Sequence, residues 1–264
     1  MKKSRKLATL GICSILILGL AACQQQHATS EGTNQRQTSS SKVPWKASYT
    51  NLNNQVSTEE VKSLLSANLD PNSVNAFFNL VNDYNTIVGS TGLSGDFTSF
   101  THTEYDVEQI SHLWNQKKGD FVGTNCRINS YCLLKNSVTI PKLEKNDQLL
   151  FLDNDAIDKG KVFDAKDKEE FDILFSRVPT EATTDVKVHA EKMEKFFSQF
   201  QFNDKARMLS VVLHDNLDGE FLFVGHVGVL VPADDGFLFV EKLTFEEPYQ
   251  AIKFASKEDC YKYL

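Results

Sequence analysis

The chain has 264 residues, of which 24% are charged and 41% are hydrophobic, and its formal net charge at pH 7 is −7. Four positive side chains, Lys2, Lys3, Arg5 and Lys6, stand at its start, so the rest of the chain carries −11. An acidic chain gains no attraction from phosphate backbones, which excludes nucleic acid as an expected partner.

The first residues combine this basic start with an apolar run and a cysteine. The run, residues 7–20, is too short for a permanent bilayer-spanning helix, which needs about 20 apolar residues. It ends in Leu-Ala-Ala-Cys, which resembles the lipobox of bacterial lipoproteins. The resemblance implies that residues 1–22 are a lipoprotein signal peptide. It also implies that Cys23 carries lipid and anchors the protein in the bilayer, on the extracytoplasmic face of the cell membrane.

A polar segment follows the cysteine. Residues 24–43 contain almost no apolar side chains, so burial cannot offset the entropy of ordering them. We therefore expect residues 23–44 to be a disordered tether. Residues 45–264 fall in the usual size range of one domain, about 50–250 residues, and show no internal repeat.

The first half of this domain is predicted to be helical. Three segments place apolar residues at helical spacing: residues 57–69, 70–89 and 105–119. Ser57 or Thr58 is the expected cap of the first helix, and Asp70 and Asp106 are the expected caps of the other two. Glycines follow the second and third helices and predict their ends.

A fourth helix is predicted to begin at Cys126. The Gly-Thr-Asn sequence before this residue is poor in helix formers, whereas apolar residues recur at helical spacing after it. Thr124 or Asn125 is then the natural N-cap, which places Cys126 in the first helical turn.

The middle of the domain contains two further predicted elements. Residues 148–153, Gln-Leu-Leu-Phe-Leu-Asp, are expected to form a short strand. Residues 184–200 are expected to form an amphipathic helix. Its predicted inward side chains are Val186, Met193, Phe196, Phe197 and Phe200.

The last third changes to strand-forming sequence. Residues 207–215, 220–231 and 236–245 are rich in β-branched and aromatic side chains, and turn-forming residues separate them. This pattern predicts an antiparallel meander. Helices followed by an antiparallel sheet indicate an α+β domain.

Three cysteines belong to the domain: Cys126, Cys132 and Cys260. Their odd number leaves at least one thiol unpaired. On one helix, Cys126 and Cys132 would lie about 240° apart and could not bridge each other, whereas a disulfide from either to Cys260 stays open. For Cys132 and Cys260 we expect buried free thiols that pack as small hydrophobes.

Cys126 is the candidate nucleophile. The free N–H groups and the dipole of a helix start favour negative charge, so a cysteine there can have its pKa lowered from about 8.5 toward neutrality. The same N–H groups can contribute to an oxyanion hole.

His226 and Glu241 are the candidate partners of this thiol. His226 lies in an apolar predicted strand between Gly225 and Gly228, and glycines inside strands often mark the close approach of another group. A turn centred on residues 234–235 would place His226 opposite Leu243 and diagonal to Glu241, on one face of the sheet. A one-residue slip would send Glu241 to the other face.

The order of a cysteine at a helix start, a histidine on a strand and an acid on the next strand resembles the papain-like cysteine hydrolases. It is most similar to the NlpC-type cell-wall peptidases and amidases, whose histidine strand resembles His-Val-Gly-Val-Leu-Val at residues 226–231. The resemblance implies a papain-like arrangement with Cys126 as nucleophile, His226 as base and Glu241 as orienting residue. Asn125 and Arg127-Ile128 replace the aspartate and the serine-glycine pair that usually flank the NlpC cysteine.

The resemblance further implies an amide or ester of the cell envelope as substrate, such as a peptidoglycan stem peptide, with no cofactor and no metal. The whole chain also resembles uncharacterised lipoproteins of Gram-positive bacteria. An alternative function is therefore a non-catalytic lipoprotein that binds a ligand or another envelope protein. A zinc site of Cys126, Cys132 and His226 is a third hypothesis, which the helix geometry disfavours because it separates the two thiols.

Overall fold

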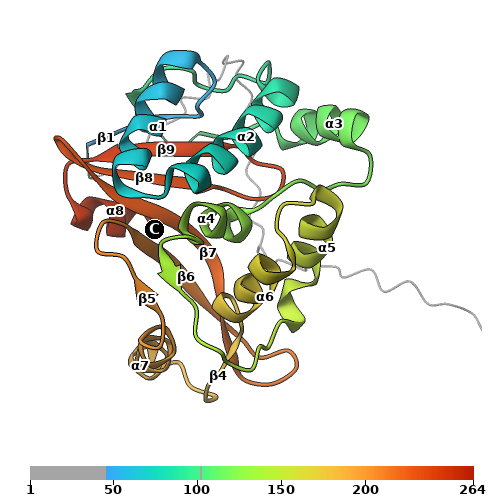
Figure 1. Cartoon of the computed structure of the whole chain (residues 1–264), viewed down its shortest axis with the longest axis vertical. Helices are drawn as coiled ribbons and strands as arrows, with labels where there is room; N and C mark the ends of the chain where they lie inside the picture. Colours follow the sequence, from blue (N-terminus) through green and yellow to red (C-terminus); the bar gives the residue numbers. More distant parts are fainter. Residues whose placement is uncertain (1–45, 102) are drawn as a thin grey trace, which may run out of the picture. The chain divides into compact units, whose positions relative to one another are not determined.

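The computed structural model describes residues 46–101 and 103–264 (Figure 1). The predicted signal peptide (1–22), the lipidated Cys23 and the tether (23–44) lie outside the described residues. The described part is α+β, as predicted. Among its helices, none is both long and apolar enough to cross a membrane.

Eight α-helices lie within the described ranges: α1 (Gln55–Asn68), α2 (Pro71–Val88), α3 (Val107–Lys118), α4 (Cys126–Leu134), α5 (Phe151–Gly160), α6 (Ala165–Leu174), α7 (Val186–Phe197) and α8 (Lys257–Tyr263). The strands of the same ranges are β1 (Ala47–Thr50), β2 (Thr98–Ser99), β3 (Val138–Thr139), β4 (Val178–Pro179), β5 (Gln201–Phe202), β6 (Arg207–Asp215), β7 (Phe221–Ala233), β8 (Gly236–Lys242) and β9 (Tyr249–Phe254).

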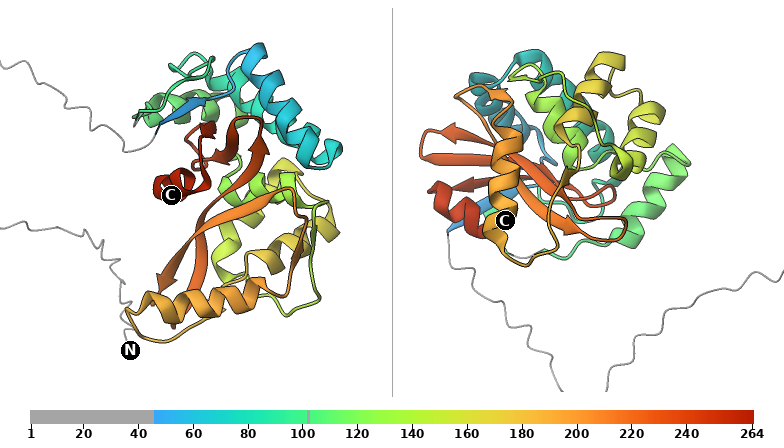
Figure 2. Two further views of the ribbon diagram at one scale, coloured as in Figure 1. Left: turned by 90° about the vertical axis from the view of Figure 1, so that its left-hand side faces the viewer. Right: turned by 90° about the horizontal axis from the view of Figure 1, so that it is seen from below.

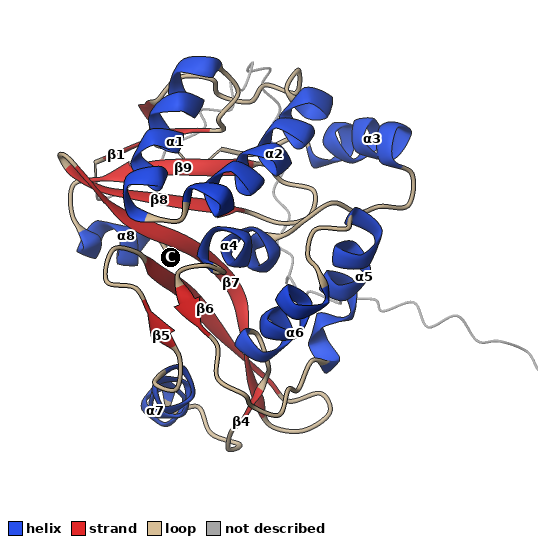
Figure 3. Cartoon of the chain, in the orientation of Figure 1, coloured by secondary structure: helices blue, strands red, loops and turns tan. Residues whose placement is uncertain are grey.

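The main sheet is antiparallel throughout, with the strand order β2-β1-β9-β8-β7-β4 and with β6 also paired to β7 (Figure 3). Helices α1, α2 and α4 cover one face. Alternate side chains of β8 show the two faces, since Leu238 and Val240 pack in the large core with these helices, while Phe239 packs with Cys260 of α8. Figure 2 shows α8 and the α1–α2 pair on different sides of the strands.

The predicted helices of the first half are confirmed. Asp70 caps α2 and Asp106 caps α3, each through its side chain, and the two helices end at Gly89 and Gly119. The cap of α1 is the one difference, because Asn54 takes this role by accepting a hydrogen bond from the Ser57 N–H. The cap therefore lies three or four residues earlier than predicted.

The predicted strand over residues 148–153 is wrong. One 3-10 turn, Gln148–Leu150, leads here into α5. A short apolar run cannot distinguish strand from helix, and only Leu150 of this run enters the core. Phe151 is 66% exposed, whereas the acidic Asp153 is fully buried, so the inward residues of this segment are not the ones its apolar pattern predicts.

Helix α7 forms as predicted with one inward residue wrong. Met193 and Phe200 are buried and Phe196 and Phe197 are partly buried, but Val186 is 76% exposed because it is the first residue of the helix. The predicted order of helices before sheet also needs correction. Strand β1 precedes all the described helices and pairs with β9, near the end of the chain.

The register of the last strands is as predicted. Strand β6 spans Arg207–Asp215, and the β7–β8 turn pairs Ala233 with Gly236. Continuing this register places His226 opposite Leu243. The ladder itself ends at Val229 and Val240, three residues before His226.

Candidate functional site

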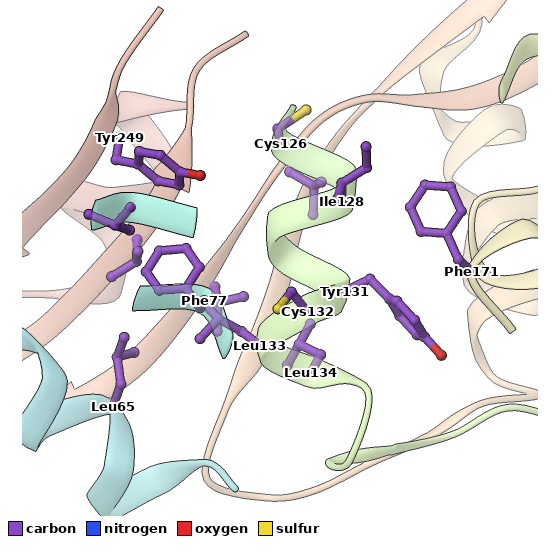
Figure 4. Close-up of a cluster of buried hydrophobic side chains, with 14 of the residues drawn as sticks. Leu65, Phe77, Cys126, Ile128, Tyr131, Cys132, Leu133, Leu134, Phe171 and Tyr249 are labelled. Atoms are coloured by element: carbon purple, nitrogen blue, oxygen red, sulfur yellow. The ribbon is translucent and has the colours of Figure 1, made fainter. Parts of the chain in front are cut away.

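Cys126 is the first residue of α4, as the sequence predicts. Asn125 caps the helix by accepting a hydrogen bond from the Ile128 N–H at 3.1 Å, which leaves the N–H groups of Cys126 and Arg127 at the helix tip. Figure 4 shows the Cys126 sulfur at this tip and the Cys132 sulfur farther along α4, pointing in another direction. The helix start therefore offers a thiol together with backbone donors.

A β-bulge in β7 lies directly before His226 and changes the direction of the strand there. Val211 of β6 pairs with His226 and Val212 pairs with Val224, so Gly225 is the extra residue of β7. At Gly228 an added Cβ would lie 2.3 Å from the Phe239 ring, so the close approach of this ring requires glycine. Both glycines beside His226 thus have a packing or geometric cause.

Glu241 binds His226 directly. Its Oε2 lies 2.5 Å from His226 Nε2, so the predicted shared face is correct. The Glu241 side chain is 1% exposed, whereas that of His226 is 25% exposed. Because Nε2 is occupied by the carboxylate, Nδ1 is the imidazole nitrogen left for another partner.

Cys126 also influences the pKa of the same imidazole. Burial lowers the pKa of His226, but the neighbouring Cys126 and Glu241 outweigh this effect and raise the pKa to about 10. The imidazole is therefore protonated at neutral pH. The three residues predicted from the sequence are brought together in one place.

A second layer of polar residues holds Glu241. The Tyr263 hydroxyl, from α8, donates to Glu241 Oε1. Burial and the neighbouring Glu241 carboxylate raise the pKa of Tyr263, which keeps this hydroxyl protonated as a donor. Beside it, Gln250 Nε2 donates to the Tyr105 hydroxyl at 2.7 Å. These residues were not predicted from the sequence, because no spacing pattern links them to residue 241.

Asp153 of α5 holds both neighbours of Cys126. Its fully buried carboxylate accepts hydrogen bonds from Asn125 Nδ2 at 2.8 Å and from Arg127 Nε and Nη2 at 2.9 and 2.7 Å. Arg127 Nη1 also donates to the Val224 carbonyl, two residues before His226, at 2.9 Å. This Asn125–Asp153–Arg127 clamp therefore joins the helix of the thiol to the strand of the imidazole. The polar pair flanking Cys126 was the one sequence signal for it.

Lys242 follows Glu241 and is the last residue of β8. Its buried Nζ donates to the carbonyl oxygens of Thr244, Phe245 and Glu247 and lies 4.2 Å from the centre of the Tyr84 ring. Burial lowers the pKa of Lys242 to about 7. The hydrogen bonds donated by Nζ thus hold the β8–β9 loop.

That loop contacts the segment leading into α4. Gly123 has a φ of +91°, and a Cβ added there would lie 3.4 Å from the Phe245 carbonyl oxygen. The chain before Cys126 is therefore packed against the loop that Lys242 holds.

The other cysteines behave as small hydrophobes. Cys132 and Cys260 are buried and, like Cys126, free, so the predicted packing role is confirmed and the alternative disulfides to Cys260 are not formed. Within residues 46–101 and 103–264, no three or more His, Cys, Asp and Glu side chains are arranged to hold a metal ion.

Access to the thiol is narrow. Cys126 is only 4% exposed. The partly exposed ring of His226 is thus the solvent side of the site.

Of the comparisons with known proteins, the one with family models finds a match for this domain. No curated protein and no solved structure matches the chain. A family model described as a domain of unknown function (DUF4300) matches residues 48–264, and the chain belongs to this family.

Proposed function

We propose that the protein is a membrane-anchored, extracytoplasmic cysteine hydrolase of the peptidase or amidase type. Cys126 is its nucleophile, His226 its acid and base, and Glu241 the residue that orients the imidazole. One observation carries the proposal: His226 binds a buried carboxylate and lies close enough to the Cys126 thiol, at a helix start, for the thiol to raise its pKa. This relation of helix, thiol and histidine strand supports a papain-like arrangement of the NlpC type.

Acylation begins from a protonated His226, which in the proposed mechanism holds the proton of the Cys126 thiol. The thiolate attacks the substrate carbonyl carbon, a C–S bond forms, and the carbonyl electron pair moves to oxygen. The N–H groups of Cys126 and Arg127 stabilise this oxyanion. His226 then protonates the leaving nitrogen, the C–N bond breaks, and a thioester remains.

Deacylation returns the site to its starting state. The now neutral His226 takes a proton from water while the water oxygen attacks the thioester carbonyl. The C–S bond breaks, the carboxylic acid leaves, and the thiolate of Cys126 is restored beside protonated His226. Glu241 stabilises the imidazolium throughout, because its own oxygens are held by His226 and Tyr263.

The proposed substrate is an amide or ester of the cell envelope within reach of a lipid-anchored domain. The lipobox-like sequence at residues 20–23 supports the anchor, and the polar residues 24–43 support a tether. Peptidoglycan stem peptides have the required amide bonds.

Alkylation of the purified full chain tests the site. After limited iodoacetamide treatment at pH 7, peptide mass spectrometry should show Cys126 modified at least tenfold faster than Cys132 and Cys260, the buried cysteines of the same chain. His226→Ala should slow the Cys126 reaction at least tenfold. His214→Ala is the matched control, because His214 forms an equally short 2.5 Å contact with Glu220. Equal reactivity of Cys126 and Cys132, or no effect of His226→Ala, would contradict the proposal.

Product formation tests the reaction class. Incubation with purified stem peptides should release new amino groups with the parent chain and none with Cys126→Ala. The second candidate function, a lipoprotein that only binds a ligand or an envelope protein, is favoured by the low exposure of Cys126. An unreactive Cys126 in a folded chain would support this second candidate.

A further inference from the structure

The largest of the described cavities lies away from Cys126, between α7 and β6. Its volume of about 900 Å³ suits a bound molecule. Met193 and Phe197 of α7 form one wall, Met208 and Val212 of β6 form the other, and Tyr261 of α8 also contributes. The right-hand view of Figure 2 shows α7 running in front of the strands. We call this cavity the β6 groove.

The groove follows the edge of β6. Five consecutive residues, 206–210, line it. Successive side chains of a strand point to opposite faces of the sheet, so a cavity against one face would touch every second residue only. Contact with consecutive residues therefore indicates that the groove runs along the strand edge.

This edge is open. Strand β6 is nine residues long and pairs with β7, and in the described part of the chain no other strand pairs with it. Backbone bonds outside the regular elements do not involve residues 207–215 either. The outer N–H and C=O groups of β6 are thus available to an added strand.

A buried hydroxyl supplies an independent sign of a missing partner. The Ser210 Oγ is buried and has no hydrogen-bond partner among the described residues, although Ser210 lines the groove. Buried hydroxyl groups are normally satisfied. The Ser210 hydroxyl is therefore an unsatisfied polar group next to the groove.

We propose that the β6 groove binds an extended peptide, which pairs with β6 as an added strand and places alternate apolar side chains against Met193 and Phe197. A single extended chain fits because α7 forms the opposite wall, which obstructs the sheet edge of a second folded copy. The charged lining favours a basic peptide, since Glu194 and Asp204 outnumber Arg207. The groove shares no residue with Cys126, His226 and Glu241.

Fluorescence polarisation with a defined probe tests the groove. The probe is a fluorescein-labelled heptapeptide of alternating valine and threonine with a lysine at each end. Saturable binding to the full chain is expected, together with slower hydrogen exchange of the β6 amides. The same peptide with alternate backbone nitrogens methylated keeps its side chains but loses donors, and should bind at least tenfold more weakly.

Two variants of one helix locate the binding. Ala190→Trp adds bulk to the groove wall at an exposed position and should weaken binding at least tenfold. Val186→Trp, at a 76% exposed position of α7 outside the groove, should leave binding unchanged. Cys126→Ala should also bind normally, so the result does not depend on the proposed catalysis.

Several outcomes would overturn this proposal. They are the absence of saturable binding up to 1 mM peptide, equal binding of the methylated peptide, and equal effects of the two tryptophan variants. Loss of binding in Cys126→Ala would place the peptide at the thiol instead. A concentration-dependent dimer that Ala190→Trp abolishes would assign the edge to self-association.

Discussion

The Cys126 site and the β6 groove share no residue and differ in how their polar groups are satisfied. At the Cys126 site, Glu241, Asp153 and Arg127 are buried or nearly so, and each has several partners. In the β6 groove, a strand edge and the Ser210 hydroxyl have none among the described residues. The first therefore holds its polar side chains in fixed positions, whereas the second leaves polar groups without a partner.

This comparison predicts that the Cys126 site depends most strongly on Asp153. Asp153→Ala leaves the largely buried Arg127 guanidinium without its carboxylate, so the free energy of unfolding should fall by about 3–5 kcal/mol. Urea denaturation measures the change. Asp120→Ala is the control, because Asp120 is 88% exposed and pairs with Lys159 at the surface. An unchanged midpoint for Asp153→Ala would show that the clamp carries no stability.

The second prediction concerns pH. The folded pKa of His226, about 10, is above its ordinary value of 6.5, so its contribution to stability is fully present below pH 6.5 and is lost as the pH rises toward 10. Glu241→Gln removes the carboxylate, so the free energy of unfolding should fall less between pH 6.5 and pH 10. The two chains should differ in this loss by on the order of a few kcal/mol. Denaturant midpoints at pH 6, 8 and 10 check it. Parallel profiles for the two chains would show that the pair does not couple to folding.

The smallest predicted effects on stability concern two buried serine hydroxyls. Ser130 of α4 donates to the Val227 carbonyl at 3.2 Å, so Ser130→Ala should cost about 1 kcal/mol. Ser210→Ala removes a hydroxyl without a partner and should leave stability unchanged or slightly higher. Thermal unfolding of the two variants, side by side, measures the difference. A larger loss for Ser210→Ala would mean that its hydroxyl is already satisfied in the free protein.

Local sequence signals were enough where the interaction is local. Asn125 caps the helix three residues ahead, and the turn at residues 234–235 sets the register that brings His226 to Glu241. Both contacts depend on short stretches with strong preferences, a capping side chain and a hairpin turn. The start of α4 and the His226–Glu241 pair were therefore predictable.

Distant partners were not predictable in the same way. Asp153 stands in an apolar run that reads as a strand, and Tyr263 stands near the end of the chain. Their roles come from α5 and α8 packing against α4 and β8, which no spacing in the sequence records. The same holds for the pairing of β1 with β9.

By itself, the sequence determined the α+β class, the helix that begins at Cys126 and the strand that carries His226, because capping, periodicity and turn chemistry act over a few residues. Only the tertiary structure decided that Tyr263 binds Glu241, that Asp153 clamps both residues beside Cys126, and that the outer edge of β6 stays open in the described part of the chain. These features depend on contacts between segments far apart in the chain, whose free energies arise only when the whole core is assembled.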